Sequence, residues 1–128
     1  MGRRRRRNAA RQRQISELLT RGTEPQVLYL TTTGRRTGLP REIEIWFTEH
    51  AGRFHLVAEH GENARWVRNV RADPAVSVRV GDRRFAARAR VVDASAEPRL
   101  CAEVRARSEA KYGWGDGLVI ELRPTKGL

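Results

Sequence analysis

The segment of this sequence best suited to chemistry is an arginine-rich turn at residues 31–41, TTTGRRTGLPR. Two glycines bracket a stretch that offers backbone N–H groups and threonine hydroxyls. Arg35, Arg36 and Arg41 place three guanidinium groups within seven residues. Guanidinium forks and turn amides bind phosphate or carboxylate groups through paired N–H donors. The segment therefore predicts an anion site, although an exposed arginine-rich turn without a ligand fits the spacing equally well.

Aromatic residues near this turn extend the predicted site. Trp46 shares one face of a predicted strand with Glu42 and Glu44. A tryptophan beside a cationic turn packs well against a planar ring whose anionic tail the turn holds. The alternative for Trp46 is a place in the core, and Trp66 either belongs to the core or borders a pocket. Cys101 lies on the apolar face of a predicted helix, so we interpret it as a core residue rather than a nucleophile.

Composition excludes several other classes of protein. The chain has 128 residues, of which 39% are apolar and 32% charged, and this allows one domain with a hydrophobic core. No apolar run is long enough to span a membrane, and no signal peptide is visible, so we expect a cytoplasmic protein. One cysteine and three scattered histidines exclude a cysteine-based zinc site, and we expect no metal. The motifs of common hydrolases and of phosphate loops are absent.

The positive charge is concentrated at the N-terminus. The net charge is +11, and residues 1–13 carry seven arginines and no acid, which leaves 19 basic and 15 acidic residues elsewhere. A run of like charges repels itself, so we predict a disordered basic tail over residues 1–13 and a single domain over residues 14–128. The arginines of residues 3–13 also suit weak, salt-dependent contact with a polyanion. A non-enzymatic nucleic-acid-binding module driven by this tail is therefore one alternative function.

The spacing of apolar residues predicts the elements that position the turn. Helical spacing covers residues 9–21, 62–72 and 96–112. Glycine-containing turns join most of the predicted strands, so the sheet should be mainly antiparallel. Six strands joined in this way favour a mainly β, α+β fold, a small closed or half-closed barrel with flanking helices. Alternation predicts these strands over residues 26–33, 41–48, 53–59, 76–80, 85–91 and 118–122.

Two motifs, in this order, make the sequence resemble a known family. The first is TTTGRRTGLPR, and the second is RWVRNVRADPAVSVRV, in which Trp66 and Asn69 precede Pro74. With LVAEHG between them, they resemble the deazaflavin-dependent nitroreductase family over about residues 26–93. The resemblance implies a split β-barrel of the FMN- or deazaflavin-binding type. It also implies binding of coenzyme F-420, an 8-hydroxy-5-deazaflavin with a phosphate and an oligoglutamate tail.

The resemblance further implies a reaction and a set of site residues. The reaction would be hydride transfer from the reduced cofactor to an electron-poor small molecule such as an enone, a quinone or a nitroaromatic. A proton would come from solvent or from Tyr112. The alternative within this fold is an FMN-binding protein of the pyridoxamine-phosphate-oxidase type. A homodimer is also expected, because a barrel that is open on one side often pairs with a second copy. The residues implied at the cofactor are Gly34, Arg35, Arg36, Thr37, Gly38, Arg41, Trp46, Ala58, Glu59, His60, Trp66 and Asn69.

Overall fold

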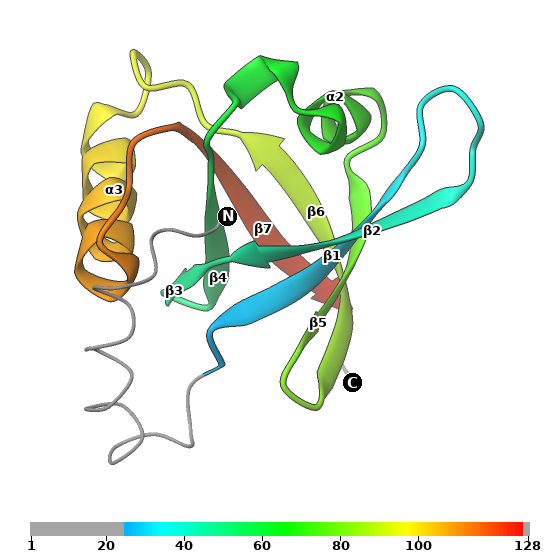
Figure 1. Cartoon of the computed structure of the whole chain (residues 1–128), viewed down its shortest axis with the longest axis horizontal. Coiled ribbons are helices and arrows are strands. Elements are labelled where there is room, and N and C mark those ends of the chain that lie inside the picture. The colour runs from blue at the N-terminus through cyan, green and yellow to red at the C-terminus, as the bar shows by residue number, and fades with distance from the viewer. Residues whose placement is uncertain (1–24, 127–128) are drawn as a thin grey trace.

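The structure is a computed structural model that describes residues 25–126 of the chain (Figure 1). The predicted helix over residues 9–21 and the basic tail of residues 1–13 lie outside the described residues. Stretches with alternating apolar side chains form strands, and those with helical spacing form helices. In chain order the elements are β1 (Val27–Thr33), β2 (Pro40–Trp46), β3 (Thr48–His50), β4 (Arg53–Ala58), the 3-10 helix η1 (Gly61–Asn63), α2 (Arg65–Ala72), β5 (Ala75–Val80), β6 (Arg83–Val91), α3 (Pro98–Tyr112) and β7 (Leu118–Lys126).

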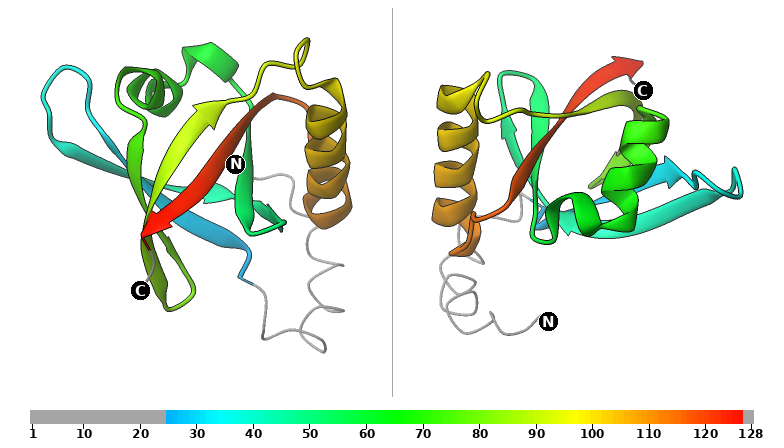
Figure 2. Two further views of the ribbon diagram at one scale, coloured as in Figure 1. Left: turned by 180° about the vertical axis from the view of Figure 1, so that it is seen from behind. Right: turned by 90° about the horizontal axis from the view of Figure 1, so that it is seen from above.

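The strands form one antiparallel sheet in the order β2-β1-β5-β6-β7-β4-β3. The sheet curls into a half-barrel, as the two views of Figure 2 show. β2 and β3 are its edges, and within residues 25–126 no ladder of hydrogen bonds joins β2 to β4. The prediction of a mainly β, half-closed antiparallel barrel with flanking helices is therefore confirmed.

The prediction of six strands is wrong, because the segment 41–48 divides at Phe47 into β2 and β3 and makes the sheet seven-stranded. The backbone N–H of Phe47 donates to the hydroxyl of Tyr112 on α3 at 3.0 Å instead of to a strand. β2 pairs with β1, whereas β3 pairs with β4. The chain thus crosses at Phe47 from one edge of the sheet to the other, a change that alternation in the sequence does not signal.

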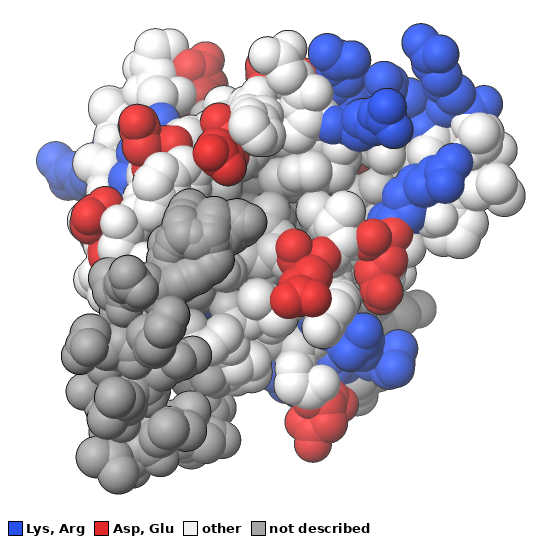
Figure 3. Space-filling view, in the orientation of Figure 1, with Lys and Arg blue, Asp and Glu red and all other residues white. Residues whose placement is uncertain are grey.

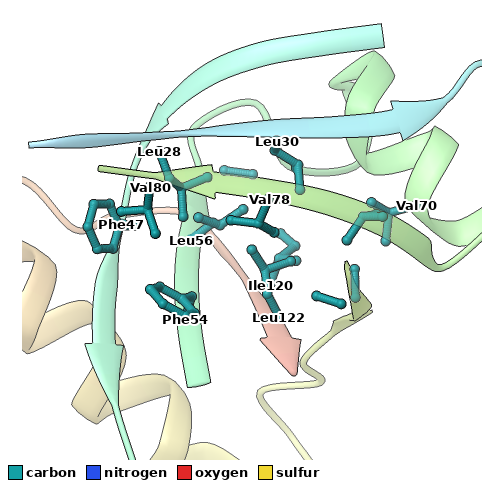
Figure 4. Packing of buried hydrophobic residues seen from close by; sticks show 14 of the residues in the cluster. Leu28, Leu30, Phe47, Phe54, Leu56, Val70, Val78, Val80, Ile120 and Leu122 are labelled. Atoms are coloured by element: carbon teal, nitrogen blue, oxygen red, sulfur yellow. The ribbon is translucent and has the colours of Figure 1, made fainter. Parts of the chain in front are cut away.

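The main core fills the concave side of the sheet (Figure 4). Buried residues of β1, β4, β5 and β7 meet there, and α2 adds Val67 and Val70. Successive side chains of β7 point to opposite faces of the sheet, so this strand contributes to two cores. Ile120 belongs to the concave core, and Val119 packs with Cys101 of α3 in a second cluster. The two helices therefore lie on opposite faces of the sheet. Cys101 is buried, which confirms that it is a core residue.

The helices begin later than their spacing predicts. Residues 61–63 form η1, and α2 begins only at Arg65, because Ala64 between them is extended with φ −73° and ψ 134°. α3 begins at Pro98, whose fixed φ suits a first turn. It ends at Tyr112, and the next residue, Gly113, adopts a left-handed φ of 81° that glycine permits. Within residues 25–126 no helix is both long and apolar enough to cross a membrane.

Candidate functional site

The turn between β1 and β2, residues 34–39, needs both of its glycines, and we call it the basic loop. The N–H of Gly34 donates to the carbonyl oxygen of Leu39 at 2.8 Å, and that of Gly38 donates to the carbonyl oxygen of Gly34 at 2.8 Å. A Cβ on Gly34 would lie 2.9 Å from Oγ1 of Thr37 and 3.2 Å from the Leu39 carbonyl oxygen. Gly38 has φ +75°, a backbone conformation that residues with a Cβ rarely adopt. The hydroxyl of Thr37 accepts the N–H of Leu39 at 3.1 Å, so the loop closes on itself, and Arg35 and Arg36 within it are exposed.

Asn69 of α2 holds the basic loop against the core. Its side-chain oxygen accepts two hydrogen bonds from Arg35, one from the backbone N–H at 3.2 Å and one from Nη1 at 3.1 Å. Its amide nitrogen donates to the hydroxyl of Thr32 at 3.1 Å. Asn69 and Thr32 are both buried. The predicted site residues Arg35 and Asn69 are thus in direct contact, and Asn69 positions the loop.

Five arginines around this contact form a surface that we call the basic patch. They are exposed on the basic loop, at the start of β2 and on α2. Within residues 25–126 no carboxylate forms an ion pair with any of them. Figure 3 shows basic side chains gathered on the side of the molecule where the loop and α2 lie. The members of the basic patch are Arg35, Arg36, Arg41, Arg65 and Arg68.

An apolar strip adjoins the basic patch along the unpaired edge of β2. Arg41 is paired with Thr32 across β1, and Ile43 and Ile45 follow it on the same face of β2. Both isoleucines are half-buried against the concave core. Trp66 of α2 is also half-buried against that core. It therefore packs on the core and also reaches the surface, so both interpretations of Trp66 from the sequence hold in part. This arrangement places apolar side chains next to cationic ones where the barrel is open.

The residues predicted beside a cofactor ring at the end of β4 are divided between core and surface. Ala58 is buried, whereas Glu59 and His60 are exposed, with Nε2 of His60 3.8 Å from Oε1 of Glu59. A Cβ on Gly117 would lie 2.4 Å from the carbonyl oxygen of Ala58. Glycine is therefore required where the start of β7 passes the end of β4, and this close approach fixes the backbone around Ala58.

The structure places Trp46 and Tyr112 away from the basic patch. Trp46 lies on the face of β2 opposite Arg41, about 17 Å farther along the strand at about 3.3 Å per residue. Its ring stacks on Tyr112, with centroids 4.4 Å apart and planes 3° from parallel. The Tyr112 hydroxyl accepts the N–H of Phe47 and lies 2.7 Å from the carbonyl oxygen of Gln26. These two predicted site residues therefore join α3 to the strands, and they do not meet the basic loop.

A second polar cluster, which sequence reasoning missed, lies under α3, and we call it the ionic network. Glu121 of β7 is buried and is opposite His55 and Arg90 on the neighbouring strands. Its carboxylate accepts hydrogen bonds from Arg90 at 2.9 Å and from Arg53 at 3.0 Å, and it lies 3.1 Å from Nε2 of His55. Arg90 also pairs with Glu97 at the start of α3. The acidic Glu121 inside the apolar run LVIEL was the sequence signal for this network.

Burial and pairing shift the pKa values in the ionic network. Burial lowers the pKa of His55 below 6.5 and outweighs the opposing effect of Glu121. Burial works against ionisation of Glu121, but hydrogen bonds from Arg90 and His55 prevail, so its pKa is lowered. Hydrogen bonds to Glu97 and Glu121 raise the pKa of Arg90. At neutral pH the network therefore holds charged arginines and carboxylates around a neutral His55.

The sequence matches the model of one protein family over most of its length. The matching model is that of the F420H(2)-dependent quinone reductases, and the match covers residues 3–116. This chain belongs to that family. The family is one of deazaflavin-dependent reductases with a split barrel, so the family and fold implied by the two sequence motifs are confirmed.

One curated relative carries the family's name, and two solved structures resemble this chain in fold. An F420H(2)-dependent quinone reductase of Mycobacterium tuberculosis is 34% identical over 71 residues, which are 53% of this chain and 48% of the relative. The match thus spans about half the length of that curated relative. A solved F420-H2 dependent reductase is 24% identical, with a TM-score of 0.52 over 77% of this chain and 94% of the other. A heme storage protein of Vibrio cholerae is 22% identical, with a TM-score of 0.67 over 90% of each chain. The two solved structures share the fold.

Proposed function

We propose that this chain binds reduced coenzyme F-420 and catalyses hydride transfer to an electron-poor small molecule, a quinone first, or an enone or nitroaromatic. The observation that carries the proposal is the basic patch, whose arginines have no acidic partner within residues 25–126, next to half-buried apolar side chains on the unpaired edge of β2. A ligand with an anionic tail and a flat apolar ring matches these two surfaces together.

The residues present fit such a cofactor. Arg36 and Arg41 offer exposed guanidinium forks for the phosphate, and the turn from Gly34 to Gly38 shapes the backbone beneath them. Asn69 keeps Arg35 in place. Ile43, Ile45 and Trp66, together with the backbone at Ala58, Glu59 and His60, would border the ring.

The reaction asks for little acid–base chemistry from the protein. The reduced deazaflavin supplies a hydride from C5, and a quinone that accepts the hydride and one proton becomes a hydroquinone. The chain would hold ring and acceptor in register and exclude water on the apolar side. Because the Tyr112 hydroxyl is hydrogen-bonded within the fold, we propose that the proton comes from solvent.

Location and partners complete the proposal. We propose that the protein works in the cytoplasm, and that residues 3–13 make weak contacts with polyanions. Because β2 and β3 leave two unpaired strand edges within the described sheet, an edge can pair with a second copy to form a homodimer. Size-exclusion chromatography with light scattering would test the dimer, and a monomeric mass at micromolar concentration would refute it.

The cofactor is tested by titration of the purified protein with coenzyme F-420 while tryptophan fluorescence is followed. We expect saturable binding at low salt, followed by oxidation of the reduced cofactor when a quinone is added. FMN serves as the comparison ligand, because it has a phosphate but no oligoglutamate tail. Saturable binding of FMN without binding of coenzyme F-420 would favour the FMN-binding alternative, and binding of neither would overturn the proposed function.

A further inference from the structure

The basic patch has two parts that come from different elements. Arg35, Arg36 and Arg41 belong to the basic loop and the start of β2, whereas Arg65 and Arg68 belong to α2. Arg65 lies one helical turn before Asn69, the residue that contacts the loop, and Arg68 lies directly before Asn69. The side of α2 that faces solvent next to the loop therefore carries two cations.

The arginines of α2 differ in how they are compensated. Arg71 makes a bidentate ion pair with the carboxylate of Glu62. Arg68 donates Nε to the backbone carbonyl oxygen of Glu62 at 3.0 Å, a bond that orients its guanidinium without neutralising it. Arg65 and Arg68 are exposed and have no carboxylate partner within residues 25–126. Glu62 thus neutralises one arginine of the helix and leaves the two nearest the loop available to an anion.

We infer that Arg65 and Arg68 form a second anion subsite, which binds carboxylates of the oligoglutamate tail while the basic loop holds the phosphate. This inference rests on the proposed function. The cofactor places its phosphate and its glutamates at successive positions along one flexible tail, so one anion site at the loop and another on α2 can be occupied together. Two exposed ion pairs add modest affinity each and make binding dependent on tail length and on salt.

The test compares the double variant Arg65→Ala, Arg68→Ala with the wild type in fluorescence titrations at low salt. Two ligands are used: coenzyme F-420 with its full tail, and the form that keeps the phosphate but lacks glutamates. We expect the variant to bind the full-length cofactor about fivefold to tenfold more weakly and to bind the form without glutamates as the wild type does. The control is Arg99→Ala, Arg107→Ala, which removes two exposed arginines of α3 and should leave both affinities unchanged.

The possible outcomes separate this inference from the proposed function. If the wild type binds both ligands, and the double variant has the same ratio of affinities for the full-length cofactor and the form without glutamates as the wild type, the α2 subsite is refuted and the proposed function stands. An equal loss for both ligands would also refute it, since the arginines would then act at the phosphate. If the wild type binds neither ligand, the proposed function and the subsite both fail. Circular dichroism and the melting temperature show that the variants are folded.

Discussion

Arginine has opposite roles in the basic patch and in the ionic network. In the ionic network, Arg53 and Arg90 converge on the buried carboxylate of Glu121, and Arg90 also binds Glu97. In the basic patch, Arg36 and Arg41 are exposed and have no carboxylate partner within the described residues. The first cluster satisfies its charges internally, whereas the second leaves its charges to solvent or to a ligand.

The difference teaches that charge pairing, and not residue type, separates structure from function in this chain. A buried carboxylate that loses its partners is costly, so the ionic network ties β4, β6, β7 and the start of α3 together. Exposed guanidinium groups add little to stability, so we propose that their cluster on the basic loop serves ligand binding. Substitutions in the two regions should therefore affect different measurements.

The largest effect is expected from Glu121→Ala. It removes the acceptor shared by Arg53, His55 and Arg90. The buried ring of His55 is left without this partner, whereas the half-exposed side chains of Arg53 and Arg90 can turn to solvent. We expect the free energy of unfolding to fall by about 3 kcal/mol, measured by urea denaturation. The matched control is Glu49→Ala, whose partner Arg83 lies 3.5 Å away at the surface, and it should cost less than about 1 kcal/mol. Equal losses in the two variants would show that the buried network is no more important than a surface pair.

Arg41→Ala should weaken cofactor binding and leave the stability of the fold nearly unchanged. The free energy of cofactor binding should weaken by about 1–3 kcal/mol because one charge-assisted fork is lost. The free energy of unfolding should change by no more than about 0.5 kcal/mol, since the side chain is exposed and has no acidic partner within residues 25–126. Fluorescence titration and urea denaturation measure the two quantities. An unchanged affinity would move the anion site away from the start of β2.

Asn69→Ala should affect both the free energy of unfolding and cofactor binding, each to an intermediate extent. Loss of its bonds to Arg35 and Thr32 should lower the free energy of unfolding by about 1–2 kcal/mol, and the released loop should bind cofactor several-fold more weakly. Thr32→Val removes only the bond to Thr32, so it should lower stability without weakening cofactor binding. If both variants bound the cofactor as the wild type does, Asn69 would have no part in positioning the loop.

The smallest effect concerns pH and His55. Because its folded pKa lies below 6.5, the unfolded chain takes up a proton more readily than the folded protein as the pH falls through that value. Stability is therefore complete above this pH and decreases in mild acid. His55→Gln should make the free energy of unfolding less dependent on pH in this range, measured by urea denaturation at several pH values. A dependence identical to that of the wild type would assign the acid sensitivity to other groups.

Much of the fold was predictable because it follows local patterns. Alternation in β1, β5 and β6, the glycines of the hairpins and the helical spacing of α3 all agree with the structure. The division at Phe47 was not predictable, because it depends on a hydroxyl that lies 65 residues away in sequence. The two-motif pattern likewise predicted the family, while the roles of the individual site residues stay predictions.

The sequence by itself determined the arginine-rich turn, its two required glycines and the family to which the chain belongs, because these are properties of neighbouring residues. Only the tertiary structure decided which side chains meet. It placed Asn69 beneath Arg35, turned Trp46 onto Tyr112, and gathered His55, Arg90 and Glu121 from three separate strands. The physical reason is that ion pairing, stacking and burial depend on distances across the sheet, which strand order and register set and which sequence spacing does not contain.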